Sequence, residues 1–255
     1  MDWRDDGLII GARRHGETSV ILELMTRGHG RHLGLVRGGR SRRLRPILQP
    51  GNLVVAQWRA RLEDHLGALT IEPLAARAAH FLDRAAALNG VASLCALLRL
   101  LPERDPHEEL FEMADAIATR LGDIRDGDNA ATMMARFELA LLGALGFGLD
   151  LNVCALTGAA NDLAYVSPKS GRAVSRAAGA PWREKLLPYP DFLQHENTAA
   201  AQGDLIAAFR LTGYFLTRDV LNPRGVTLPA ARDLYIDALA RAARAGSEKV
   251  DRLFR

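Results

Sequence analysis

The sequence has 255 residues, of which 48% are hydrophobic and 25% are charged, and its formal net charge at pH 7 is +3. This length suits one large domain or two to three small ones, and the composition is that of a globular protein rather than of a disordered chain. No apolar run approaches the roughly 20 residues that a membrane helix needs, and the N-terminus lacks the basic start and apolar stretch of a signal peptide. We therefore expect a cytoplasmic protein that binds no membrane, with Cys95 and Cys154 reduced.

Up to about Glu72, short runs rich in Val, Ile and Leu are separated by Gly and polar residues, which is typical of strands joined by turns. The predicted strands are Leu8–Arg13, Ser19–Thr26, Arg31–Val36, Asn52–Leu62 and Gly67–Glu72. In the fourth strand Val54, Ala56 and Trp58 share one face, so we expect Trp58 in the core and not on a base-stacking surface. Short strands of this number predict a small barrel, for which the OB-fold is the five-stranded candidate.

From about Ala75 the apolar residues recur at spacings of three and four, as on one face of a helix. The predicted helices are Leu82–Leu101, His107–Leu121, Asn129–Phe147, Thr198–Leu221 and Pro229–Ala245. Between the third and fourth of them, residues 150–196 are irregular and contain four prolines. We therefore predict an α+β fold in which residues 1–74 form the barrel, residues 75–149 and 197–255 form a mostly α-helical domain, and residues 150–196 form an insertion.

The segment RHGET, Arg14–Thr18, matches the start of the histidine phosphatase signature, in which the histidine is the phosphorylated nucleophile. In those enzymes the motif ends a strand and leads through a loop into a helix. Here SVILEL follows and alternates as a strand, and the other histidines lie in no comparable motif. We interpret Gly16 as a turn between antiparallel strands and keep a phosphatase acting through His15 only as an alternative.

The arginines are concentrated in the predicted barrel. No acidic residue occurs between Glu23 and Glu63, whereas nine arginines do. Five of these arginines lie in one stretch of nine residues inside the segment Val36–Asn52. This segment lies where an OB barrel connects its third and fourth strands, and Gly38, Gly39 and Ser41 suggest that it is flexible. Guanidinium groups bind phosphate oxygens bidentately without reading base sequence, so the segment predicts a nucleic-acid interface. The predicted DNA-binding residues are Arg31, Arg37, Arg40, Arg42, Arg43, Arg45, Arg59 and Arg61.

Several motifs follow one another in a distinctive order: GET before an apolar strand, TRGHGRHLGLVRGGR, a loop ending in LQPGN, RFELALLGALGFGLDLNVCALTG and YVSPKSGRAVS. From about Leu8 to Ser175 this order resembles the RecO family of bacterial DNA repair proteins. The resemblance implies an N-terminal OB-fold, a central helical bundle and a small zinc-ribbon-like insertion. It also implies a recombination mediator that binds single- and double-stranded DNA, anneals complementary strands and acts at the nucleoid.

The partners that the resemblance implies are RecR, the single-stranded DNA-binding protein and, indirectly, the RecA recombinase that is loaded onto coated DNA. The acidic C-terminal tail of the single-stranded DNA-binding protein requires a basic, partly apolar pocket. The candidate residues are Lys169, Arg172, Arg176, Arg210 and Arg218, and the helix around Arg218 is the first choice.

The insertion departs from the zinc-bearing members of the family. Their two Cys-x2-Cys pairs supply four thiolates to one tetrahedral ion. The matching positions here are Cys154, Thr157, Ser175 and Ala178, so three of the four ligands are missing. We predict no bound zinc and a buried, structural role for Cys154.

His29 and His32 flank a predicted Gly28–Gly30 turn, and we expect both to be exposed, since no nearby carboxylate or thiolate would complete a metal site. No phosphate-binding loop, Rossmann fingerprint, nucleophile elbow or spaced acid–base pair occurs in the sequence. We therefore predict a protein that is not an enzyme and has no cofactor. An RNA-binding OB-fold module would explain the same basic loop and stays open as an alternative.

Overall fold

The computed structural model describes residues 1–62, 64–123, 127–195 and 198–253. The chain divides into two compact units, Met1–Ala130 and Ala131–Arg255, which we describe one at a time. The first unit therefore contains the barrel together with the first two helices.

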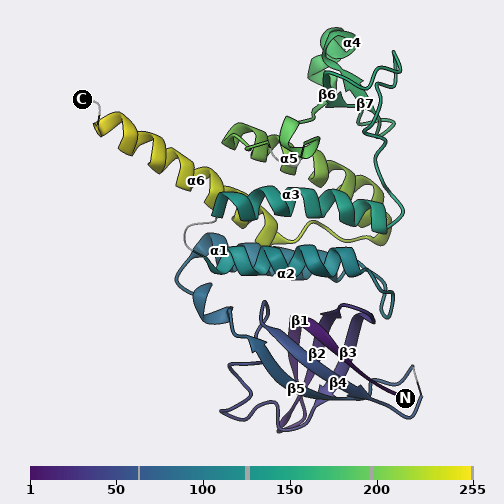
Figure 1. Ribbon diagram of the computed structural model, residues 1–255, viewed down its shortest axis with the longest axis vertical. Coiled ribbons are helices and arrows are strands. Elements are labelled where there is room, and N and C mark those ends of the chain that lie inside the picture. Colours follow the sequence, from purple (N-terminus) through teal and green to yellow (C-terminus); the bar gives the residue numbers. More distant parts are fainter. Residues whose placement is uncertain (63, 124–126, 196–197, 254–255) are drawn as a thin grey trace. The chain divides into compact units, whose positions relative to one another are not determined.

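The first unit is built around a closed barrel (Figure 1). Its strands are β1 (Asp2–His15), β2 (Ser19–Thr26), β3 (Gly30–Val36), β4 (Leu53–Arg59) and β5 (Ala68–Ala75). They pair in the order β1-β2-β3-β5-β4, and all neighbours are antiparallel except β3 and β5. The predicted α+β fold with an OB-like N-terminal barrel is confirmed, and each strand lies where the sequence predicts it, although β1 begins at Asp2 and not at Leu8.

Strand β1 closes the barrel because it is long enough to pair with two neighbours. Its first half, Asp2–Leu8, pairs with β4, and its second half pairs with β2 as far as His15. The register shifts between Ile9 and Gly11, a bulge of the kind that bends a strand so that a barrel can close. An added Cβ at Gly11 would lie 2.0 Å from the Arg99 guanidinium, so the end of that side chain would have to move.

The barrel core follows from alternation along the strands. In β4, Val54, Ala56 and Trp58 are buried while the residues between them are half-buried or exposed, and Trp58 is only 1% exposed. The prediction that Trp58 belongs to the core is confirmed. Leu48 also joins this cluster, although it comes from the Arg-rich loop and not from a strand.

Two helices of the first unit pack against the barrel: α1 (Ala85–Leu98) against β1, and α2 (Glu108–Gly122) against β1 and β2. A short 3₁₀ helix, η1 (Ala78–His80), precedes them. On α2 the buried residues Leu110, Ala114, Ile117 and Leu121 recur at the predicted helical spacing.

The second unit contains most of α3 (Gly127–Ala144), together with α5 (Gln202–Phe215) and α6 (Ala230–Leu253). A buried ion pair connects all three helices. Glu138 on α3 accepts bonds from Arg232 on α6 at 2.7 and 2.8 Å, and also from the hydroxyl of Thr212 on α5. The shorter helical segments of the unit are α4 (Arg176–Gly179), η2 (Ala180–Lys185), η3 (Asp191–Leu193), η4 (Leu216–Leu221) and η5 (Asn222–Arg224).

Every predicted helix forms, with small changes at its ends. The predicted helix Leu82–Leu101 is shorter, as Ala85–Leu98, and the predicted Thr198–Leu221 forms as α5 followed by a turn of π-helix in η4. Among the described residues, none of the helices combines the length and the apolar character that crossing a membrane requires.

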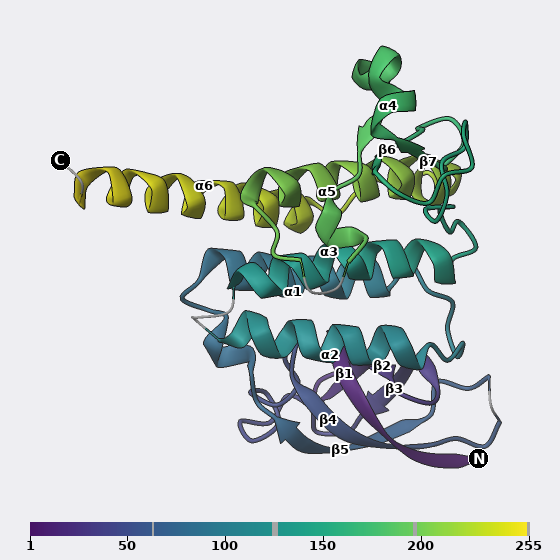
Figure 2. The ribbon, with the colours of Figure 1, turned by 45° about the horizontal axis from the view of Figure 1, so that its top comes forward.

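A small sheet forms between α3 and α5 in the sequence. Its strands are β6 (Leu163–Val166), β7 (Ala173–Ser175) and β8 (Leu187–Pro188), in the order β7-β6-β8. Figure 2 shows α4 and the β6–β7 hairpin grouped together. The tip of this hairpin is closed by a bond from the Gly171 N–H to the Ser167 carbonyl at 2.9 Å, with Gly171 at a φ of 68°.

Candidate nucleic-acid interface

The Arg-rich loop between β3 and β4 is anchored to the barrel and is not the flexible segment that its glycines suggest. Gly39 is buried, and a Cβ there would lie 2.9 Å from the Cβ of Val20. The Arg40 N–H donates to the Thr18 carbonyl at 3.0 Å, and Leu48 is 3% exposed in the barrel core. The glycine allows close packing here, which composition alone does not distinguish from mobility.

Asn52 closes the C-terminal end of this loop. Its buried side chain donates to the carbonyls of Pro46 and Ile47 at 3.0 and 2.9 Å. Its oxygen accepts the N–H groups of Arg77 and Ala78 at 2.7 and 2.9 Å. One uncharged amide therefore holds both the Arg-rich loop and the chain segment that leads to α1.

The loop lies beside the turn between β1 and β2. The Arg40 guanidinium donates to the carbonyl oxygens of Gly16 and Glu17 in that turn. Together the two segments enclose a cavity of about 210 Å³, lined by the basic side chains of Arg13, Arg14, Arg40 and Arg45. Its remaining lining residues are Ala12, Val20, Gly39, Leu48 and Gln49. We call this the basic cavity.

The guanidinium groups around the basic cavity have little local compensation. Arg13 and Arg14 on β1 are exposed, as are all five arginines of the loop, Arg37–Arg45. Among the described residues, no carboxylate forms an ion pair with any of these seven side chains. Such a set is suited to bind an anion, because the charges converge from two segments that the fold holds in place.

Sequence reasoning missed Arg13 and Arg14. They are separated from the loop by two strands, and only the antiparallel pairing of β1 with β2 brings them beside Arg40 and Arg45. A signal was available in the sequence, because Arg14 opens RHGET and Arg13 directly precedes it, but this motif points to His15 and not to the arginines.

Some of the arginines predicted to bind DNA already form ion pairs with carboxylates. Arg31, which is 18% exposed, pairs with Glu23 at 2.7 Å and lies 3.5 Å from Glu103. Arg27, also counted in the basic window, pairs with Glu108 and Glu112 of α2. The absence of acids between Glu23 and Glu63 therefore overstates the free charge, because partners that are distant in the sequence lie close in space.

Arg59 and Arg61 lie at and just beyond the end of β4 and do not line the basic cavity. Both are exposed, and the nearest carboxylate to the Arg59 side chain is Asp2, at 3.9 Å. An exposed pair at this distance contributes little stability. These two residues therefore form a separate basic feature of the barrel.

His15 stands at the end of β1, directly opposite Ser19 of β2. Gly16 has a φ of 57°, as expected for a tight turn, and a second antiparallel strand follows in place of the phosphatase helix. The interpretation of RHGET as a strand turn is confirmed.

The prediction of two exposed histidines is wrong for His32. Its ring is 3% exposed and packs edge-on against Trp3 and Trp58, with centroids 5.0 and 4.8 Å away. Burial, together with the positive charges of Arg104 and His29, lowers the pKa of His32 to about 4. His29 stacks on Trp3 and contacts the Asp5 carboxylate at 2.9 Å, so a nearby carboxylate exists after all.

Three of the four positions that correspond to zinc ligands, Cys154, Thr157 and Ser175, lie together in the insertion. Cys154 is buried, and its Sγ accepts the N–H of Ser175 at 3.2 Å, while the Thr157 hydroxyl accepts the Ala159 N–H at 3.4 Å. One thiolate, two hydroxyls and the methyl group of Ala178 do not make a zinc site. Among the described residues there is no cluster of three or more His, Cys, Asp and Glu side chains able to hold a metal ion.

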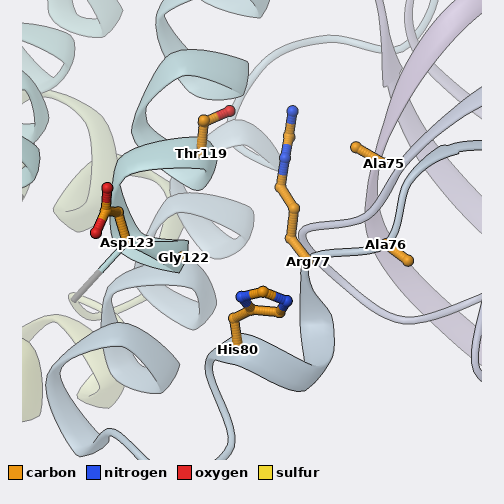
Figure 3. Close-up of a pocket in the computed structure, with 7 residues that line it drawn as sticks. All are labelled: Ala75, Ala76, Arg77, His80, Thr119, Gly122 and Asp123. Carbon is orange, nitrogen blue, oxygen red and sulfur yellow. The ribbon is translucent and has the colours of Figure 1, made fainter.

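A wider cavity of about 730 Å³ lies between the β5–α1 connection and the end of α2 (Figure 3). Its lining residues are Ala75, Ala76, Arg77, His80, Thr119, Gly122 and Asp123. The Arg77 guanidinium is already paired with Asp115 at 2.6 Å. Because the lining also includes the carboxylate of Asp123, this cavity lacks the excess of positive charge found in the basic cavity.

Comparison with known proteins agrees with this anatomy. Residues 1–77 match the family model described as recombination protein O N terminal, and residues 82–227 match recombination protein O C terminal. The chain belongs to the RecO family. DNA repair and recombination are therefore the processes in which it acts, and neither the family descriptions nor the names of the relatives mention a catalytic activity.

The similarity to relatives named DNA repair protein RecO extends over nearly the whole chain. The DNA repair protein RecO of Rhizobium etli is 57% identical over 249 residues, which cover 97% of this chain and 96% of the relative. Those of Rhodopseudomonas palustris and Methylocella silvestris are 57% and 58% identical, covering 94% and 92% of this chain and 97% and 95% of the relatives.

Proposed function

We propose that this RecO protein is a non-enzymatic recombination mediator that binds single- and double-stranded DNA through the barrel and anneals complementary strands. It would assist loading of RecA onto DNA coated by the single-stranded DNA-binding protein, with RecR as a further partner, in the cytoplasm at the nucleoid. Residues 1–74 would be the nucleic-acid-binding domain, with residues 75–149 and 197–255 as the helical domain and residues 150–196 as a zinc-ribbon-like insertion that lacks most of the metal ligands.

The observation that carries this proposal is the basic cavity with the exposed arginines beside it. Arginine forks bind phosphate oxygens bidentately and do not distinguish bases, as annealing of arbitrary sequences requires. Two complementary strands repel each other through their phosphates, and neutralising that charge lowers the barrier to their pairing. The proposed contacts are Arg37, Arg40, Arg42, Arg43 and Arg45, with Arg59 and Arg61 extending the surface and Arg31 held in its ion pairs.

The second unit offers a separate cavity for the acidic tail of the single-stranded DNA-binding protein. It has a volume of about 780 Å³, and its lining includes Lys185, Arg210 and Arg218 beside Leu186 and Tyr214. Arg218 is held by Asp219 at 2.6 Å and lies 4.7 Å above the Phe215 ring. The lining also includes the carboxylate of Glu184, but its cations outnumber that single acid, and a basic, partly apolar cavity matches a peptide that ends in acidic and apolar residues. Of the other candidates, Arg172 and Arg176 already pair with Asp150 and Asp162 at 3.0 Å, and the cavity lining does not include Lys169.

The DNA part is tested by replacing Arg40, Arg42 and Arg43 together with Glu. Each lost phosphate contact on a single strand lowers the slope of log affinity against log salt by about 0.7, so the slope should fall by about 2. The matched control replaces the same three residues with Lys, which keeps the charge, and its slope should stay close to that of the parent. An unchanged affinity and slope in the Glu variant would remove this loop from the interface.

The mediator part is tested by annealing of two complementary oligonucleotides without ATP, with and without a stoichiometric coat of single-stranded DNA-binding protein. Acceleration that persists on coated strands supports the proposal. Binding without acceleration on bare strands would leave a nucleic-acid-binding barrel of another role. Competition between single-stranded DNA and RNA of equal length distinguishes the RNA-binding alternative.

A further inference from the structure

An apolar groove borders the basic cavity in the first unit. Ala12 and Gln49 line both, so the two hollows lie on either side of these residues. The groove has a volume of about 350 Å³, which lies within the range of roughly 300–1,000 Å³ typical of small-ligand sites. Its lining residues include Ile10, Pro50, Phe81, Leu82, Leu88, Val91, Ala92, Cys95 and Arg99.

The groove has a firm floor and an open rim. Phe81, Val91 and Cys95 are buried beneath it, whereas Leu82 and Leu88 at the rim are 69% and 45% exposed. Because both leucines line the same groove, they offer exposed apolar surface that an apolar ligand group could cover. One end of the groove is fixed by Arg99, whose guanidinium is held by Glu23 at 2.7 Å and donates to the Ile10 carbonyl.

Gln49 adds a hydrogen-bonding group where the two hollows meet. Its side-chain Nε2 donates to the Arg45 carbonyl at 2.8 Å, which fixes the orientation of the amide. Among the described residues no group donates to the amide oxygen, so that oxygen can accept a bond from a ligand. A polar acceptor at the edge of an apolar floor suits a flat heterocycle with N–H groups on its rim.

We propose that the groove receives one unstacked base of a single strand whose neighbouring phosphate lies in the basic cavity. This inference rests on the proposed DNA-binding function and deepens it, because it says that the barrel prefers single-stranded over double-stranded DNA. In a duplex the bases are paired and stacked, so only a single strand can place a base here without breaking base pairs. The barrel would then bind duplex through phosphates alone and single strands through phosphates and a base.

The charge distribution favours a nucleic acid over an acidic peptide. Four exposed arginines line the basic cavity and three more belong to the same Arg-rich loop, and seven cations match the many phosphates of a strand better than one carboxylate cluster. The two neighbouring hollows also fit the two parts of a nucleotide. The charged cavity of about 210 Å³ suits the phosphate, and the adjacent apolar groove of about 350 Å³ suits the base. A peptide that carries an acidic and an apolar side chain is the competing occupant, and the experiment includes it.

The test uses the full chain, with Leu82 and Leu88 both replaced by Ser. Fluorescence anisotropy would measure binding of a thymidine oligonucleotide, an abasic oligonucleotide with the same number of phosphates, and a duplex. Base contacts in single-strand sites contribute about 1–3 kcal/mol per base, so affinity for the thymidine strand should fall about fivefold or more. Affinity for the abasic strand and for the duplex should stay unchanged, since neither places a base in the groove.

A matched control is Leu74→Ser, which removes an equally exposed leucine of the same unit outside the groove and should leave all three affinities unchanged. A second variant, Ala92→Phe, fills the groove without removing apolar surface and should cause the same selective loss as the double Ser variant. Unfolding midpoints equal to that of the parent would show that the variants are folded.

Three outcomes would overturn the inference. One is an equal loss on all three ligands, and another is no loss on the thymidine strand in either groove variant. The third is competition by an acidic, apolar-ended peptide that the groove variants abolish while base-dependent binding is absent, which would assign the groove to a peptide. Failure of the DNA-binding function itself is distinct, because the parent protein would then bind none of the three nucleic acids.

Discussion

His32 makes the stability of the barrel depend on pH. Its ring is buried edge-on against Trp3 and Trp58, and neither ring nitrogen has a hydrogen-bond partner, so protonation would place a desolvated cation in the core. The folded pKa of His32 is lowered from 6.5 to about 4. Because the unfolded chain binds the proton more tightly, acidification favours unfolding. The contribution to stability is complete above pH 6.5 and is lost as the pH falls towards 4.

The size of the effect follows from the two pKa values. A difference of one in pKa corresponds to about 1.4 kcal/mol, so the full loss below pH 4 is about 3 kcal/mol. Between pH 7.5 and pH 5, linkage with the same two values gives a loss of about 2 kcal/mol. The variant His32→Leu lacks the titrating ring, so its free energy of unfolding should fall by about 2 kcal/mol less than that of the parent over the same range.

Urea unfolding followed by tryptophan fluorescence measures this difference. The chain has three tryptophans, and replacing Trp182 with Phe leaves only Trp3 and Trp58, both in contact with His32, so that the signal reports the barrel. His15→Gln in the same background removes an exposed histidine of the barrel and serves as the control. If the parent, His15→Gln and His32→Leu show the same dependence on pH, the assignment to His32 is refuted.

Other predictions concern the ion pair, the loop and the metal. Arg232→Leu leaves the fully buried Glu138 carboxylate without its cation and should destabilise the second unit by about 3–5 kcal/mol in thermal or urea unfolding; adding Glu138→Leu should recover most of the loss. Asn52→Ala breaks the bonds that close the Arg-rich loop and should cost about 1–3 kcal/mol in urea unfolding. The same variant should weaken DNA binding in anisotropy without changing the charge, and an unchanged affinity would mean that the loop needs no anchoring. Elemental analysis of the purified protein should find no stoichiometric zinc, and one equivalent retained after washing with chelator would contradict our interpretation of the insertion.

The strands of the barrel could be predicted because the sequence patterns that specify them involve residues close together in the chain. Alternation along β4 identifies Val54, Ala56 and Trp58 as one buried face, and the glycines of the turns mark where strands end. The predicted ends of the strands and helices were less accurate. The first residues of β1, Asp2–Gly7, look polar in the sequence, and they form a strand because β4 pairs with them.

The interface was only partly predictable because charge compensation is a property of three dimensions. Arg31 and Arg27 lie in a stretch without acids, yet Glu23 from the neighbouring strand pairs with the first and Glu112 from α2 with the second. The same reason hid Arg13 and Arg14, whose proximity to the loop depends on strand pairing. His32 was mispredicted because a histidine next to glycines reads as a turn residue, whereas its neighbours in space are two indole rings.

The arginines of the basic cavity repel one another and cannot hold their own arrangement. Two unit charges 4 Å apart repel by about 1 kcal/mol in bulk water, and by about 4 kcal/mol at the effective dielectric of a protein surface. The arrangement is held by uncharged groups: Leu48 in the core, Gly39 against Val20, and Asn52 at the end of the loop. A bound phosphate turns this repulsion into attraction, and because the loop is already ordered, little conformational entropy is lost when the phosphate binds. The affinity for nucleic acid that we propose for this barrel would therefore depend on its apolar anchors as well as on its charges.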